Sequence, residues 1–154
     1  MKHNYTQNAW EGKKYNGNKW LTSTEIAKAI RKDLKKALPD CKFSVRKHDF
    51  AGGRSITVSL MAAPFKVIEK AKIGRIKGNK AYYHRTINDC CLDKYLLPES
   101  DPQLTPQAVD LLKKVTEIAQ AYNYSDCNSQ IDYFDVNFYF HLEIGQWNKP
   151  FKDA

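Results

Sequence analysis

Residues 131–144 read IDYFDVNFYFHLEI, and their apolar and polar side chains alternate without a break. One set is apolar and comprises Phe134, Val136, Phe138, Phe140, Leu142 and Ile144. The other set comprises Tyr133, Asp135, Asn137, Tyr139, His141 and Glu143. A period of two is typical of a strand with one buried face. We therefore predict one unusually long strand, roughly 45 Å from end to end at about 3.3 Å per residue, at the centre of the core.

A β-hairpin is predicted upstream of this stretch. Lys42–His48 and Arg54–Met61 both alternate, and Asp49–Gly53 contains the Gly-Gly pair expected of a turn. The inward-facing side chains of the two strands would be Phe43, Val45, Ile56, Val58 and Leu60.

The first long helix is predicted to begin after Thr22. Thr22 and Glu25 have the spacing of a capping box, and Pro39 ends the helical pattern. Apolar residues recur at spacings of three and four, which indicates one buried stripe: Ile26, Ala27, Ile30, Leu34, Ala37 and Leu38.

A second long helix is predicted after Thr105, with Pro106 at its first position. Its buried stripe would comprise Val109, Leu112, Val115, Ile118, Ala119 and Tyr122. Two shorter helices are predicted over residues 65–72 and 89–97.

These elements predict one α+β domain over residues 20–146, in which a mainly antiparallel sheet of three to four strands has two long helices packed on its apolar face. Residues 1–19 would form a polar, basic N-terminal arm, and residues 147–154 a C-terminal tail. We expect the arm to dock on the protein's own core through Trp10 and Trp20. The alternative is that its aromatic residues contact nucleic acid by stacking.

Charge is distributed unevenly along the chain, whose formal net charge is +8. Residues 1–85 contain 20 Lys and Arg against 6 Asp and Glu, a balance of +14, whereas residues 86–154 contain 5 against 11, a balance of −6. Such asymmetry indicates a polyanionic partner such as nucleic acid. Neutralisation of the basic half by the acidic half within the molecule is an equally weighted alternative.

Other features of the sequence concern the location of the protein in the cell. The longest apolar runs fall well short of the ~20 residues that a membrane helix needs, and the N-terminus has no apolar signal region. The four cysteines (Cys41, Cys90, Cys91 and Cys127) form no CxxC motif, so we expect free thiols. These features predict a cytoplasmic protein that does not contact membranes.

Cations cluster in three segments, and we predict that they bind nucleic acid through phosphate contacts. The first helix contributes Lys28, Arg31, Lys32 and Lys35; the hairpin contributes Arg46, Lys47 and Arg54; and the basic segment 73–85 contributes Arg75 and Lys77. In that last segment the cations are interleaved with Tyr82, Tyr83 and His84, a combination that suits single-stranded nucleic acid. A solvated basic surface without a ligand is the alternative interpretation of each segment.

Two stretches resemble a known group of domains. They are Trp20–Pro64 (WLTSTEIAKAIRKDLKKALPDCKFSVRKHDFAGGRSITVSLMAAP) and Tyr122–Gly145 (YNYSDCNSQIDYFDVNFYFHLEIG), together 69 of the 154 residues. They resemble one of the large-polyvalent-protein-associated domains, which occur in long proteins of phages and conjugative elements and as small stand-alone proteins. The resemblance implies accessory work for a mobile element, on DNA or against host defence, and implies no catalytic residues.

Three classes of function follow from these observations. The first, which we favour, is a non-catalytic accessory protein of a mobile element that binds nucleic acid. The second is a protein-binding inhibitor of a host defence nuclease of restriction or CRISPR type. The third is a metal-dependent nuclease built on Asp135, His141 and Glu143. Because the chain has no GxSxG, P-loop or HExxH motif, we predict no catalytic residues, no metal site and no cofactor.

Overall fold

The computed structural model describes residues 9–15, 21–67, 85–87, 104–131, 135–146, 149 and 151. Two α-helices and six strands are present in these residues, which confirms the prediction of an α+β fold. In chain order the elements are β1 (Trp10–Glu11), α1 (Ser23–Ala37), β2 (Lys42–Phe50), β3 (Gly53–Ala62), β4 (Arg85–Ile87), α3 (Pro106–Gln120), β5 (Tyr124–Ser125), a 3-10 turn (Ser129–Ile131) and β6 (Tyr139–Ile144).

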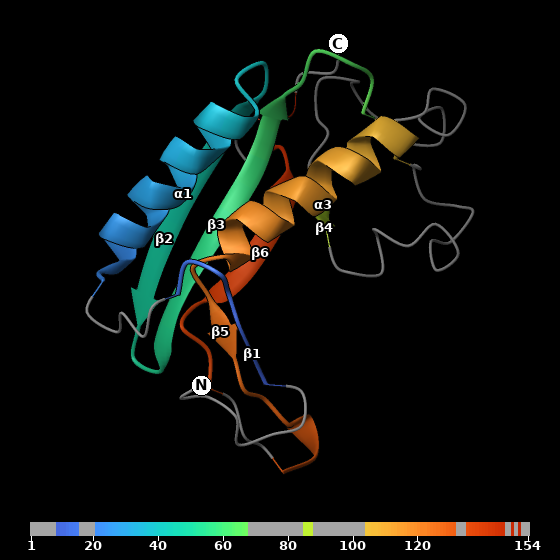
Figure 1. Ribbon diagram of the computed structural model, residues 1–154. Coiled ribbons are helices and arrows are strands. Elements are labelled where there is room, and N and C mark those ends of the chain that lie inside the picture. The colour runs from blue at the N-terminus through green and yellow to red at the C-terminus, as the bar shows by residue number, and fades with distance from the viewer. Residues whose placement is uncertain are drawn as a thin grey trace.

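The main sheet has four strands in the order β2-β3-β6-β4. The pairs β2–β3 and β4–β6 are antiparallel, as expected, but β3 and β6 are parallel, so the sheet is mixed. A parallel pair needs a long crossover connection, and the chain that leads from β3 through α3 to β6 supplies one. Both helices lie on the same face of the sheet, α1 along β2 and α3 across β6 (Figure 1).

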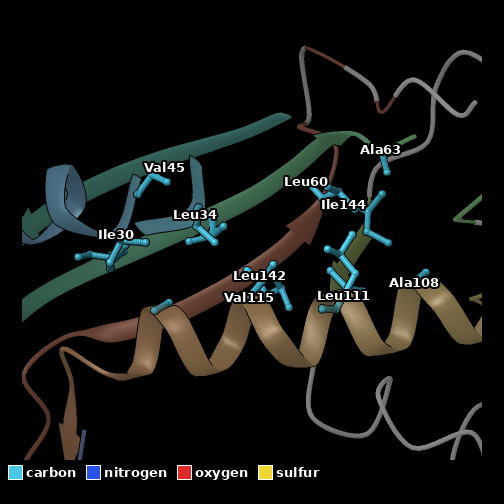
Figure 2. Packing of buried hydrophobic residues seen from close by; sticks show 14 of the residues in the cluster. Ile30, Leu34, Val45, Leu60, Ala63, Ala108, Leu111, Val115, Leu142 and Ile144 are labelled. Atoms are coloured by element: carbon cyan, nitrogen blue, oxygen red, sulfur yellow. The ribbon is translucent and has the colours of Figure 1, made fainter. Parts of the chain in front are cut away.

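The core lies between this sheet and the two helices (Figure 2). Figure 2 shows Leu111 and Val115 of α3 directed at Leu142 and Ile144 of β6. Four residues of the predicted stripe of α1 are buried, Ile26, Ala27, Ile30 and Leu34, whereas Ala37 is exposed and Leu38 is half-buried; Ser23 is buried in addition. The buried stripe of α3 is partly different, because Ala108 and Leu111 are buried while Val109, Ile118 and Tyr122 are half-buried.

Both helices begin where the sequence predicts. The side chain of Thr22 accepts a hydrogen bond from the backbone N–H of Glu25 at 3.1 Å, and that of Thr105 accepts one from Ala108 at 3.2 Å. Pro106 follows Thr105 at the start of α3, where its missing N–H costs nothing.

The hairpin has longer strands and a shorter turn than predicted. Asp49 and Phe50 are not turn residues, because they pair with Arg54 and Gly53 respectively. The connection therefore consists of Ala51 and Gly52. Gly53 follows it with φ of 154°, a conformation that side chains other than glycine rarely adopt.

The predicted long strand over residues 131–144 is wrong: only Tyr139–Ile144 form β6. Ile131 ends a 3-10 turn, and Val136 forms an isolated bridge with Ser125 of β5, outside the main sheet. The chain thus changes partner near Phe138, whose backbone bonds to the side chain of Asn123. Alternation continues across this change of partner, which is why the sequence suggests a single strand.

The described part of the N-terminal segment packs against the body. Trp10 and Glu11 pair with Ser125 and Tyr124 in a two-stranded antiparallel sheet. Tyr15 is buried, and its ring lies 4.8 Å from that of Tyr124, measured between centroids. Trp10 pairs with Ser125 through β1 and remains 38% exposed.

Several predicted features lie wholly or partly outside the described residues: Trp20, most of the helix at 65–72, the helix at 89–97, Arg75 and Lys77. Phe65, Lys66 and Val67 are described and are not helical. Cys41 and Cys127 are free thiols. Neither α1 nor α3, the two helices described, is long and apolar enough to cross a membrane.

Candidate nucleic-acid interface

The outer surface of α1 carries a row of lysines. Lys28, Lys32 and Lys35 are exposed and follow one another at intervals of four and three residues, on the side away from the buried Ile30. Within the part of the chain that the structure describes, none of the three forms an ion pair. We call this row the α1 stripe. It brings together three of the predicted site residues on one rigid element.

Arg31 lies at the border of the α1 stripe and already has a partner. Its guanidinium donates a hydrogen bond to the backbone carbonyl of Val45 at 2.8 Å. Val45 belongs to β2, the edge strand of the sheet. Arg31 therefore ties α1 to this edge, while its side chain stays on the exposed side of the helix.

Arg46 lies on the face of the sheet opposite the helices. Its guanidinium bonds to the carboxylate of Glu143 and donates to the hydroxyl of Ser59 at 3.3 Å. The Ser59 hydroxyl in turn donates to Glu143 at 2.7 Å. This network spans β2, β3 and β6, so Arg46 helps to hold three strands together.

Lys47 lies on the helix side of β2, not beside Arg46. Its ammonium group is 2.8 Å from a carboxylate oxygen of Asp49, and the other oxygen of Asp49 accepts a hydrogen bond from the Ser23 hydroxyl. The bond from Lys47, with that from Ser23, lowers the pKa of Asp49 below its usual value. Lys47 thus contributes to the contact between the hairpin and the start of α1.

Arg54 has a structural role. Its guanidinium donates to the backbone carbonyl of Leu21 at 2.7 Å, to that of Asn137 at 2.9 Å, and to the Asn137 side-chain oxygen at 2.6 Å. It therefore joins β3 to the segments that precede α1 and β6. A pocket of about 480 Å³ opens beside it, with polar walls formed by Thr22, Ser23, Thr24, Lys47, Asp49, Gly53, Arg54 and Asn137.

The sheet face opposite the helices carries polar and aromatic side chains in register. His48 is paired with Ser55, which is paired with Tyr139; one row further, Arg46, Thr57 and His141 align in the same way. Exposure increases towards the β2–β3 turn. Ser59 is buried and Glu143 is 12% exposed, but His141 and His48 are exposed.

Three rings form a cluster at the exposed end of this face. The centroid of Phe50 lies 5.9 Å from that of His48 and 6.0 Å from that of Tyr139. Phe50 is 43% exposed and Tyr139 is 38% exposed. We call these three residues the aromatic cluster. Sequence reasoning assigned Phe50 to a turn and missed the cluster, although a hairpin with a two-residue turn would have placed Phe50 on the same face as His48.

The residues of the nuclease hypothesis are not brought together as predicted. Asp135 lies before β6 and accepts a hydrogen bond from the Tyr124 hydroxyl at 2.8 Å. Burial, followed by this bond, raises the pKa of Tyr124 well above its usual value. His141 and Glu143 lie on β6 within the main sheet. Among the described residues, no group of three or more His, Cys, Asp or Glu side chains is arranged to hold a metal ion.

The comparison with protein families matches one segment of the chain. Residues 21–96 match the model described as large polyvalent protein associated domain 29. Over these residues the chain is similar to that family. The match contains α1, β2, β3 and β4 and confirms the resemblance over the first stretch, Trp20–Pro64, whereas the second stretch, Tyr122–Gly145, lies outside it. No curated protein and no solved structure matches the chain.

Domain 29 and the C-terminal part of the chain build the site jointly. The matched residues include the α1 stripe and Phe50, whereas Tyr139 and Glu143 lie outside residues 21–96. The strand β6, also outside the match, lies between β3 and β4 in the sheet. The bonds of Arg46 to Glu143 and of Arg54 to Asn137 both connect domain 29 to this C-terminal part.

Proposed function

We propose that the protein binds nucleic acid through the phosphate groups, with the α1 stripe as the contact surface. The observation that carries this proposal is the exposed row of Lys28, Lys32 and Lys35 on a helix whose opposite side is fixed in the core. A cation that is already paired with a carboxylate gains less free energy when it contacts a phosphate. Within the described residues, the lysines of the stripe have no such carboxylate.

The other predicted contact residues take a smaller part in this proposal. Arg46 and Lys47 are paired with carboxylates, and Arg54 uses its guanidinium for three bonds within the protein. Arg31 lies beside the stripe and completes it, since its bond to the Val45 carbonyl occupies one amino group and no carboxylate of the described residues forms an ion pair with it.

Sequence-independent binding is the kind of binding that this surface favours. Lysine side chains on the outside of a helix approach phosphates as mobile point charges and do not read base edges. An accessory protein of a mobile element that acts on many sequences would need this property. Similarity to large polyvalent protein associated domain 29 over residues 21–96 supports such a context, since the resemblance noted in the sequence implies a mobile element.

The magnitude of the salt effect tests the proposal. Three phosphate contacts predict a slope of about −2.7 for log K against log salt on duplex DNA, so affinity should fall roughly 40-fold between 50 and 200 mM salt. Fluorescence anisotropy with labelled duplex and single-stranded DNA and RNA measures this slope.

A matched pair of variants separates the stripe from the net charge. Lys28→Glu/Lys32→Glu changes the stripe, and Lys113→Glu/Lys114→Glu makes the same change of charge at exposed positions of α3. We expect the first variant to lose binding and the second to retain most of it. Equal losses would show that only the overall charge matters. No binding by the wild-type protein at low salt would overturn the proposal and favour the inhibitor hypothesis.

A further inference from the structure

The sheet face opposite the helices provides a second site, and its ligand class follows from its aromatic side chains. We propose that the aromatic cluster binds unpaired bases of single-stranded nucleic acid by stacking on Phe50 and Tyr139. This inference rests on the proposed function for its ligand, but it concerns a different surface. It adds a preference for single strands that the α1 stripe does not provide.

The position of the rings results from strand alternation. Arg46, His48 and Phe50 are separated by two residues each, so their side chains project from the same face of β2. The parallel pairing of β3 with β6 then places Tyr139 across Ser55 on that face. The centroids of Phe50 and Tyr139 lie 6.0 Å apart with their planes inclined by 33°, so the two partly exposed rings are close neighbours on this face.

The exposure of these rings distinguishes the cluster from the core. A phenylalanine side chain normally buries its large apolar surface, yet Phe50 remains 43% exposed. Both helices pack on the opposite face of the sheet (Figure 1). Gly52 and Gly53, which lie near the rings, have no side chain to cover them, and a Cβ on Gly53 would lie 3.6 Å from ring carbons of both Phe50 and Tyr139.

The border of the cluster is polar. Arg46 projects from the same face of β2 as His48 and Phe50, and its charge is paired with Glu143. The hydroxyls of Ser55 and Thr57 and the imidazoles of His48 and His141 supply further polar groups on the same face. An apolar partner would favour a more apolar border, whereas aromatic rings beside cations and hydroxyls are typical of surfaces that bind single strands.

Duplex DNA would not use this site. The bases of a duplex are stacked on one another, so their faces cannot reach rings that lie on a flat sheet. The stripe on α1 and the cluster are also on opposite sides of the edge strand β2. The two sites can therefore be tested separately, the stripe with duplex and the cluster with short single strands.

The experiment compares leucine and aromatic substitutions at the cluster. Phe50→Leu and Tyr139→Leu keep an apolar side chain but remove the ring, while Phe50→Trp and Tyr139→Phe keep a ring. Ile131→Ala removes apolar surface at a 58% exposed position away from the cluster. Binding of 12-nucleotide oligo(dT) and oligo(U) and of a 12-base-pair duplex is measured by anisotropy, and circular dichroism checks that each variant is folded.

We expect each leucine variant to bind both single strands roughly 5- to 150-fold more weakly, the range that corresponds to a stacking contribution of about 1–3 kcal/mol per base. Duplex binding should be unchanged, and the ring-retaining variants and Ile131→Ala should bind as the wild type does. A loss with oligo(U) alone would restrict the ligand to RNA and still support the site.

Other outcomes separate this inference from the proposed function. Leucine variants that bind single strands normally, while Lys28→Glu/Lys32→Glu does not, would overturn the aromatic site and leave the α1 stripe standing. The reverse result would support the aromatic site and overturn the stripe. If a leucine variant does not fold, amide shifts of Phe50, Ser55 and Tyr139 in the wild-type protein on adding a tetranucleotide decide the question, and unshifted amides overturn the inference.

Discussion

The side chain of Asn123 takes the place of a neighbouring strand for Phe138. Its oxygen accepts a hydrogen bond from the Phe138 N–H at 3.1 Å, and its amide nitrogen donates to the Phe138 carbonyl at 3.0 Å. Both residues are buried. This pair lies where the chain leaves the neighbourhood of β5 and enters β6. One side chain therefore supplies hydrogen-bond partners for the backbone N–H and carbonyl at the point where the strand changes partner.

Asn123→Ala should therefore destabilise the protein more than an ordinary surface substitution. It leaves the buried N–H and carbonyl of Phe138 without their partner, and we expect a loss of about 2–3 kcal/mol in the free energy of unfolding. Denaturation with urea measures this loss. Asn128→Ala is the control, because its side chain bonds to the backbone of Gln130 at an exposed site. A loss no larger than that of the control would disprove the role assigned to Asn123.

The contact between Asn123 and Phe138 also explains which parts of the fold the sequence predicts and which it does not. The two long helices, their caps and the hairpin follow from local patterns, because each is determined by residues within about 20 positions of one another. The length of β6 depends on Asn123, which is 15 residues away from Phe138 and has no recognisable signal. Alternation alone does not reveal which strand a residue pairs with.

The candidate site was predictable to a similar extent. Helical spacing alone identifies Lys28, Lys32 and Lys35 as one exposed row. It does not reveal that Arg46 and Arg54 are engaged, because their partners, Glu143 and Asn137, are more than 80 residues away. A cation that is conspicuous in the sequence can thus be a structural residue.

Asp33 should contribute a pH-dependent part of the stability. Burial on its own would raise the pKa of this carboxylate, but hydrogen bonds from Lys14 and Tyr122 outweigh burial and lower it. A carboxylate whose pKa is lower in the folded state stabilises the fold above its unfolded pKa, about 3.9, and this stabilisation is lost as the pH falls through the folded value.

We therefore expect Asp33→Asn to be less stable than the wild type at pH 7 and to lose less stability between pH 5 and pH 2. Urea denaturation at several pH values measures both slopes. Asp110→Asn, at an exposed position of α3, serves as the control and should follow the wild-type curve. Parallel curves for Asp33→Asn and the wild type would contradict the prediction.

Gly12 is required where the N-terminal segment meets the end of α3. A Cβ at this position would lie 2.2 Å from the carbonyl oxygen of Gln120 and 2.3 Å from that of Ala121, closer than any real contact. Gly12→Ala should thus displace the segment and break the hydrogen bond from Lys14 N–H to the Ala121 carbonyl. We expect a loss of about 1–3 kcal/mol, the usual cost of overpacking.

Hydrogen exchange of the Gly12 and Lys14 amides is the measurement for this variant, since detachment of the segment would speed their exchange. Gly52→Ala is the matched control. A Cβ there would have Phe50 as its nearest neighbour, at 4.0 Å, so it should have little effect. Unchanged exchange in Gly12→Ala would show that the segment adapts without detaching.

Arg54→Lys tests whether the cations of the hairpin stabilise the fold or bind the ligand. Lysine keeps the charge but cannot donate at once to the Leu21 carbonyl and to both oxygens of Asn137. We expect the free energy of unfolding to fall by about 1–3 kcal/mol while the salt slope of nucleic-acid binding stays the same. Lys28→Ala should do the opposite, reducing the slope by about one and leaving stability unchanged. If Arg54→Lys instead weakened binding without loss of stability, its guanidinium would belong to the ligand site, and the division between structural cations and the α1 stripe would be wrong.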